Sequence, residues 1–130
     1  MSPKMMGCGI AALVVFIVAA AIVVHVWTIS DLLACDTDAK GTTPSPDGKR
    51  TVVMFAVNCG ATVPFNTQLS ISPIDRRFSR DDSPAFLILD GEHKLPVVWT
   101  GDRSIVIDLP KDARVFRSER RVNDVTIEYR

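Results

Sequence analysis

The longest apolar stretch of the chain lies at its amino terminus. No charged side chain occurs between Met5 and Ser30, a run of 26 residues. As a helix rising about 1.5 Å per residue, the part from Gly7 to Thr28 extends roughly 33 Å, which matches the hydrocarbon thickness of a bilayer. The pattern therefore predicts one membrane-spanning helix, with residues 1–30 as an amino-terminal anchor.

After this stretch the pattern changes to short apolar runs separated by turns. Asp36 to Ser45 is polar and lacks periodic apolar residues, which predicts a linker over residues 31–44 before a domain over residues 45–130. Seven prolines, from Pro44 to Pro110, interrupt almost any window long enough for a stable helix. Ser45 to Gly48 reads SPDG, a sequence typical of a turn followed by a strand.

Six segments carry the pattern of strands. The run from Thr51 to Val57 is continuously apolar and rich in β-branched residues, as expected of a strand covered on both faces. Phe65 to Ile71 alternates apolar and polar residues, which predicts a half-buried strand. The others are Ala85 to Leu89, Val97 to Thr100, Ile105 to Leu109 and Val122 to Tyr129. Tight turns between them favour an all-β fold, a small antiparallel meander or sandwich.

The charges that flank the apolar stretch predict its orientation. Lys4 precedes it, whereas Asp31 and Asp36 follow it before any cation. The positive-inside rule then places the amino end in the cytoplasm and the β domain outside, for example in the periplasm next to a bacterial inner membrane. A cleaved signal peptide is the alternative. Its apolar core rarely exceeds about 15 residues, and Leu32-Leu33-Ala34 has leucine where a cleavage site needs a small residue.

The three cysteines divide between the two parts of the chain. Cys8 lies in the apolar stretch, and Cys35 and Cys59 follow it. In an oxidising compartment two thiols of one small domain usually pair, so we predict a disulfide between Cys35 and Cys59. The alternative is a lipoprotein, because Leu32 to Cys35 resembles a lipobox. Cys35 would then be acylated and Cys59 free.

The charge balance of the outer part argues against one class of partner. From Asp31 onward, 14 Lys and Arg side chains stand against 15 Asp and Glu, a net charge of −1. A nucleic-acid-binding domain usually has a strongly basic face, so we expect no nucleic acid partner. The densest basic patch contains Arg114, Arg117, Arg120 and Arg121. A charged edge strand accounts for this patch, and contact with anionic lipid or an acidic partner is the alternative.

Two segments carry a resemblance to a known family. The segment SPDGKRTVVMFAVNCGATVPFNTQLSISP and the closing VTIEYR resemble a family of small bacterial proteins of unknown function. In these proteins a membrane or lipoprotein leader precedes a β domain, and the shared pattern is the SPDG turn, the CGAT segment and a following TQ pair. The chain departs from it at Val63 and Pro64 and at Ser83 to Phe86. The resemblance implies architecture and compartment, and no established activity.

One polar cluster is a candidate binding site. It contains Asn58, Gly60, Thr62, Thr67 and Gln68. The structural alternative to ligand binding is that the polar side chains form hydrogen bonds with loop amides and that the glycine allows the backbone to turn. A thiol enzyme would pair Cys59 as nucleophile with His93 as base, but no third orienting group is indicated. One outer histidine predicts neither a metal site nor a cofactor.

These features together predict a membrane protein that is not an enzyme. We expect its β domain to bind or support another component of the cell envelope, with the membrane and an envelope protein as partners.

Overall fold

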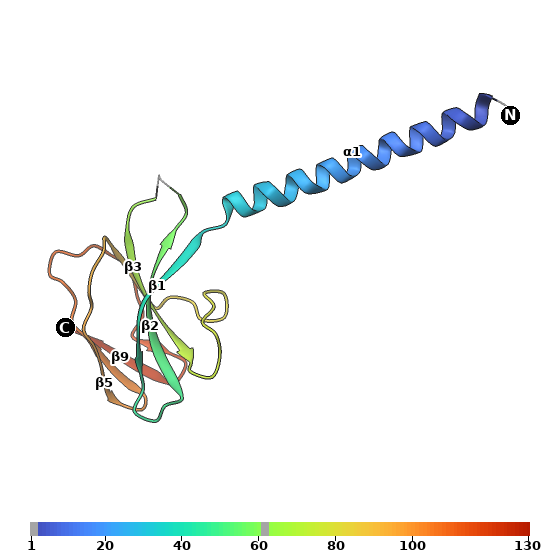
Figure 1. Cartoon of the computed structure of the whole chain (residues 1–130). Helices are drawn as coiled ribbons and strands as arrows, with labels where there is room; N and C mark the ends of the chain where they lie inside the picture. The colour runs from blue at the N-terminus through green and yellow to red at the C-terminus, as the bar shows by residue number, and fades with distance from the viewer. Residues whose placement is uncertain (1–2, 61–62) are drawn as a thin grey trace. The chain divides into compact units, whose positions relative to one another are not determined.

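The chain forms a helix and a separate β domain (Figure 1). The computed structural model describes residues 3–60 and 63–130. It divides the chain into two compact units, Met1–Ala34 and Cys35–Arg130. The sheets of the second unit confirm the expected all-β fold preceded by one helix.

Helix α1, Pro3–Leu33, is apolar on all sides. A helix of this kind belongs inside a large core or inside a membrane. The side chains of Gly9–Ser30 are all exposed, so no protein core surrounds them. Near the end of this segment Thr28 donates hydrogen bonds to the carbonyls of Val24 and His25, and Ser30 donates to that of Val26. By length and composition this segment is a membrane anchor or a signal sequence.

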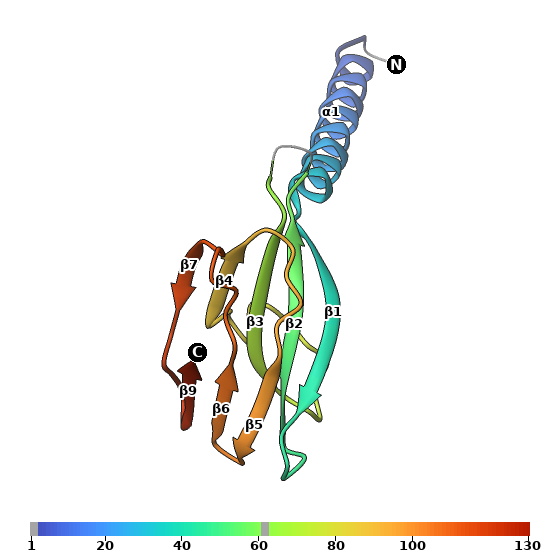
Figure 2. The same cartoon turned by 90° about the vertical axis from the view of Figure 1, so that its left-hand side faces the viewer.

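The β domain contains two sheets, and Figure 2 labels all of their strands except β8. The five-stranded sheet has the order β1-β2-β3-β4-β7 and the four-stranded sheet the order β5-β6-β9-β8. The strands of the first sheet are β1 Asp36–Pro44, β2 Arg50–Asn58, β3 Asn66–Pro73, β4 Leu87–Asp90 and β7 Val115–Ser118. Those of the second are β5 Val97–Gly101, β6 Ser104–Ile107, β8 Arg121–Val122 and β9 Val125–Tyr129.

The six expected strand segments all contain strands, and consecutive partners such as β2 and β3 pair antiparallel as predicted. Two features differ from a simple meander. Strands β6 and β9 pair in parallel, because the chain leaves the second sheet after β6 and returns to it through β7. The segment Val122 to Tyr129 is also two strands, separated by a turn at Asn123, which has a positive φ of 52°.

The expected linker over residues 31–44 is wrong. Asp36–Pro44 is strand β1, which pairs along its whole length with β2, from Asp36 opposite Asn58 to Pro44 opposite Thr51. The β domain therefore begins at Cys35 rather than at residue 45. The polar composition of β1 reflects its position at the edge of the sheet, where nearly all of its side chains are exposed.

Strand β2 is buried on both faces, as its continuous apolar run predicts. Val52 belongs to the core between the two sheets, together with residues such as Leu69 of β3 and Ile107 of β6. The next residue along, Val53, belongs to a second apolar cluster on the opposite face. Residues 74–86 supply the cover there, with the ring of Phe78 centred 5.0 Å from that of Phe55.

The side of the sandwich formed by β4, β7, β8 and β9 is closed by the chain itself. Between β7 and β8 the backbone crosses from one sheet to the other. Glu119 N–H donates to the Phe86 carbonyl on the first sheet at 2.8 Å, and Ile127 N–H on the second sheet donates to the Arg120 carbonyl at 2.9 Å. The Tyr129 hydroxyl also donates to the Glu119 carbonyl at 2.6 Å. We call this the closed side.

The opposite side is bounded by β1 and β5, which are the edge strands of the two sheets there. A hydrogen bond joins them, from Trp99 Nε1 in β5 to the carbonyl of Thr43 in β1, at 2.9 Å. No strand in the described part of the chain pairs with the outer edge of β1. We call this the open side.

Candidate functional site

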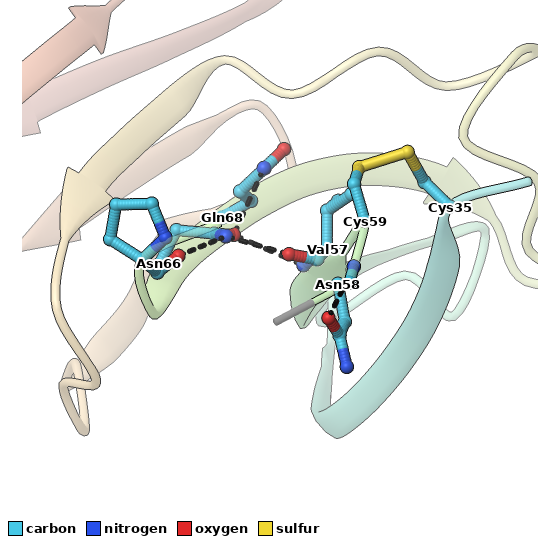
Figure 3. The surroundings of a disulfide bond; sticks show 8 residues. Cys35, Val57, Asn58, Cys59, Asn66 and Gln68 are labelled. Atoms are coloured by element: carbon cyan, nitrogen blue, oxygen red, sulfur yellow. Dashed lines mark hydrogen bonds between the residues drawn. A yellow bond between two sulfur atoms is a disulfide. The ribbon is translucent and has the colours of Figure 1, made fainter. Parts of the chain in front are cut away.

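The predicted disulfide between Cys35 and Cys59 is present and joins the ends of two neighbouring strands (Figure 3). Cys35 immediately precedes β1, and Cys59 immediately follows β2. Asp36 and Asn58, one residue inward on each strand, are register partners. The bridge therefore fixes the start of an exposed edge strand to a buried central strand.

The disulfide occupies the sulfur atoms that the lipoprotein and the thiol-enzyme alternatives would need. An acylated Cys35 and a nucleophilic Cys59 both need a sulfur that is not bonded to another cysteine, and here the two are bonded to each other. His93, the expected base, has local partners instead. Its ring atom Nε2 lies 2.8 Å from the carbonyl oxygen of Asp90, and its backbone N–H donates to Thr67 Oγ1 at 2.9 Å.

The polar residues beside Cys59 hold the loop in shape. Asn58 Oδ1 accepts a hydrogen bond from Gly60 N–H at 3.0 Å, an arrangement that closes a tight turn. Gly60 has a φ of 107°, a region that side-chain-bearing residues rarely enter. Thr62 lies outside the described residues. The described part of this loop thus fits the structural alternative.

Asn66 is the residue at this end of the domain that sequence reasoning missed. Its side-chain amide forms a double hydrogen bond with Val57, accepting from Val57 N–H at 3.0 Å and donating to its carbonyl at 2.7 Å (Figure 3). Gln68 Nε2 donates to the same Asn66 Oδ1 at 3.1 Å. The Asn66 side chain therefore continues the pairing of β2 with β3 beyond the last backbone partners, Phe55 and Gln68.

Thr67 and Gln68 do not form one cluster. They are consecutive in β3, so their side chains point to opposite faces of the sheet. Thr67 is almost fully buried, at 4% exposed, and its hydroxyl donates to the Gly91 carbonyl at 2.8 Å. With the bond from His93 N–H, this hydroxyl fixes the loop between β4 and β5 to β3.

A groove of about 780 Å³ opens between β1 and this loop, on the open side of the sandwich. Its apolar floor comes from residues of both sheets and of the loop, namely Val52, Met54, Leu69, Leu95 and Val97. Along one wall Gly41 of β1 is the register partner of Met54. A side chain added at Gly41 would meet no atom within 4 Å, so the groove is empty at that point of its wall.

The rim of the groove carries charges of both signs. Lys40 lies on β1, and Glu92 and Lys94 lie on the facing loop. Lys40 Nζ is 2.6 Å from Asp38 and 3.9 Å from Glu92. The hydrogen bond and opposite charge of Asp38, with a smaller contribution from Glu92, raise the pKa of Lys40 above its ordinary value. This cation is therefore firmly charged at neutral pH.

The four arginines of the basic patch lie on the closed side, away from the groove. Arg117 is in β7, the last strand of its sheet, where it pairs with Glu119. Arg121 lies in β8, at the end of the other sheet, and its Nε donates to the Asn123 carbonyl. The Arg114 guanidinium lies 5.1 Å from the centre of the Phe116 ring. Arg117 and Arg121 therefore lie on edge strands, as expected, whereas Arg114 and Arg120 lie just outside these strands.

A second ionic cluster, which sequence reasoning missed, joins the turn ends of the two sheets. Asp124, in the turn between β8 and β9, lies 2.8 Å from Arg50 of β2 and 3.2 Å from Arg103. Partial burial would raise the pKa of Asp124, but the Arg50 hydrogen bond and the two positive charges outweigh it, so this pKa is lowered. The cluster is structural. Within residues 3–60 and 63–130, no three His, Cys, Asp or Glu side chains gather as metal ligands.

The fold and the leader define the class of this chain: a single-pass membrane or secreted protein with a disulfide-bonded, all-β domain. Comparisons with protein-family models, with curated proteins and with solved structures found no match. The resemblance of the SPDG and CGAT segments to a bacterial family stays a prediction.

Proposed function

We propose that this chain is a single-pass protein of a bacterial inner membrane, held by α1, with its β domain on the outer side. Two features support this. The side chains of Gly9–Ser30 are exposed and predominantly apolar, so a bilayer is their natural environment. The Cys35–Cys59 disulfide is a bond that persists in the periplasm and outside the cell but is rare in the cytosol.

We further propose that the β domain binds an extended segment of another envelope protein and catalyses no reaction. The single observation that carries this proposal is the groove along β1. An extended peptide gains affinity from main-chain hydrogen bonds to a free sheet edge and specificity from pockets for alternate side chains. Strand β1 offers such an edge, and Val52, Met54 and Leu95 offer an apolar floor beside it.

The composition of β1 suits reversible binding of one partner. At Lys40 the pairing of β1 with β2 shifts by one residue, so the edge carries both a bulge and a positive charge. Both features hinder indiscriminate pairing with other strands. Gly41 leaves the wall beside Met54 open. A partner strand with apolar side chains toward the floor and an acidic residue near Lys94 fits this surface.

The experiment compares the two edge strands of the five-stranded sheet in living cells. A photo-crosslinking amino acid replaces Lys94 at the rim of the groove or, as the matched control, Arg117 on β7. We expect a discrete crosslinked product from position 94 that is absent from position 117. The same product from both positions would contradict the proposal, because the groove would then have no special role.

A second variant separates groove binding from general proximity. Gly41→Trp adds a large side chain on the wall of the groove, at a position where a Cβ atom meets no other atom within 4 Å. We expect this variant to abolish the product formed at position 94, while Arg117→Trp leaves it unchanged. Unaltered crosslinking in a folded Gly41→Trp protein would exclude the groove as the binding site.

A further inference from the structure

Three consecutive apolar residues are exposed in the loop between β2 and β3. They are Val63, Pro64 and Phe65, and Phe65 is 79% exposed. Single exposed apolar residues are normal on protein surfaces, but a contiguous group on a loop indicates a contact surface. The Phe65 backbone is fixed, because its carbonyl accepts a hydrogen bond from Gly91 N–H at 2.8 Å. The exposed ring is thus held on an ordered part of the domain.

The disulfide limits how far this loop can lie from the apolar span. Cys59 is bonded to Cys35, and Cys35 follows Ser30, the last residue of the span, by five positions. Five residues reach no more than about 18 Å even when fully extended. This limit applies to Cys35, to which the start of the loop at Cys59 is bonded; it comes from covalent connectivity and holds for any orientation of the domain.

Val63 and Phe65 lie at the same end of the domain as the disulfide. With Asp36 and Asn58, the residues next to the two cysteines, they line one hollow of about 700 Å³. The register supports this placement, because the Asn66 side chain pairs with Val57 near the end of β2. The exposed apolar group and the start of the domain therefore share one surface.

We propose that Val63, Pro64 and Phe65 rest in the interfacial layer of the bilayer that α1 spans, and so form a second attachment of the domain to the membrane. This inference rests on the proposed anchoring role of α1. Phenylalanine side chains on membrane-surface elements bury at the boundary between the lipid headgroups and the acyl chains, where the ring is removed from water.

The charges around the loop favour zwitterionic over anionic lipid. Asp36, Asp38 and Glu92 line the same hollow, with Lys40 as its one cation among the residues that the structure places there. This net negative surface gains nothing from anionic headgroups, so the attachment depends on apolar contact. A second attachment limits rotation of the domain about the short connection at Ala34 and gives the groove a constant orientation toward the envelope.

The experiment measures the depth of position 65 in a bilayer. The intact chain, with its leader retained, is reconstituted into nanodiscs of phosphatidylcholine brominated near the headgroup end of the acyl chains. Phe65→Trp supplies the probe, in a Trp27→Phe background that removes the fluorophore of the span. The matched control is Phe116→Trp in β7, because Phe116 is also an exposed phenylalanine, 56% exposed.

We expect brominated lipid to quench the Phe65→Trp protein several-fold more strongly than the Phe116→Trp protein, whose emission stays at the level of the parent containing Trp99 alone. Equal quenching at the two positions would overturn the proposal. So would quenching at position 65 that appears only with anionic lipid, since the attachment would then be electrostatic. Crosslinking at the groove is measured separately, so failure of one proposal leaves the other testable.

Discussion

The two sides of the sandwich are built from similar strands but end differently. On the closed side the chain passes from β7 to β8, and Glu119 and Arg120 give backbone hydrogen bonds to both sheets. On the open side β1 and β5 meet through the single bond from Trp99 to Thr43, and the groove lies beside it. A sheet edge that the chain joins to its own strands is unavailable to partners, whereas an unjoined edge remains available. This difference is the reason for placing the proposed binding site on the open side.

The largest expected effect comes from removing a core side chain on the closed side. Phe86 is 1% exposed and its carbonyl accepts the bond from Glu119. Phe86→Ala leaves a cavity, so we expect the free energy of unfolding to fall by about 4 kcal/mol. Urea unfolding of the intact chain in detergent micelles measures this change. Val98→Ala, on the 53% exposed surface of β5, is the control and should change stability by less than about 0.5 kcal/mol. Comparable losses in both variants would show that Phe86 does not contribute more to the folded state than an exposed residue of β5 does.

Removing the disulfide should be the next largest change. The bond closes a sequence separation of 24 residues, which in the chain-entropy model contributes roughly 3 to 4 kcal/mol. The double variant Cys35→Ser with Cys59→Ser should lose about this much in the same unfolding measurement, compared with Cys8→Ser as the control. We also expect faster amide hydrogen exchange in β1 than in β3, because β2 is then the one strand that holds the β1 backbone by strand pairing, whereas β3 pairs with both β2 and β4. Equal protection of the two strands would show that the edge needs no covalent support.

The bond across the open side should contribute less. Trp99→Phe keeps a ring in place but removes the N–H that donates to the Thr43 carbonyl. A typical intramolecular hydrogen bond contributes about 1 kcal/mol, so we expect a loss of that size. The groove should remain intact, and crosslinking at position 94 should persist. A loss as large as that of Phe86→Ala would mean that the open side carries as much of the stability as the closed side.

The last expected effect is absent at neutral pH and is confined to high pH and to the closed side. Burial, followed by the nearby charge of Glu119, raises the pKa of Tyr129 to about 12, above the value of about 10 that tyrosine has in an unfolded chain. The neutral hydroxyl therefore contributes stability that is fully present below the unfolded pKa and is lost as pH rises through the folded pKa. Unfolding measured from pH 9 to 12 should show this loss, and Tyr129→Phe should reduce it. An identical pH profile in the variant would exclude Tyr129 as the cause.

The strands that the sequence pattern predicted are those whose own residues determine their burial. In β2 the run from Val52 to Val57 needs both faces covered, whatever its neighbours are. Strands β1 and β7 escaped prediction because exposed edge strands have no apolar periodicity, and their conformation depends on pairing with β2 and β4. The pattern of apolar and polar residues gives no signal for a strand whose conformation depends on pairing with its neighbour.

The same distinction holds for the candidate sites. The disulfide was predictable because two cysteines of one small domain usually pair in an oxidising compartment. The two hydrogen bonds between the Asn66 side chain and the Val57 backbone were not predictable, since they depend on the register of β2 and β3. The groove was also beyond sequence reasoning, because it results from which edges the chain leaves unjoined.

The central claim is that α1 remains in the membrane and delivers the β domain to the outer side. Protease treatment of intact spheroplasts, followed by mass determination of the membrane-bound fragments, tests retention and orientation together. The account predicts that external protease reaches the domain and leaves a protected fragment that contains Met1 and the apolar span. A chain that is protected until the cells are lysed, or a mature protein that lacks the leader, would contradict it.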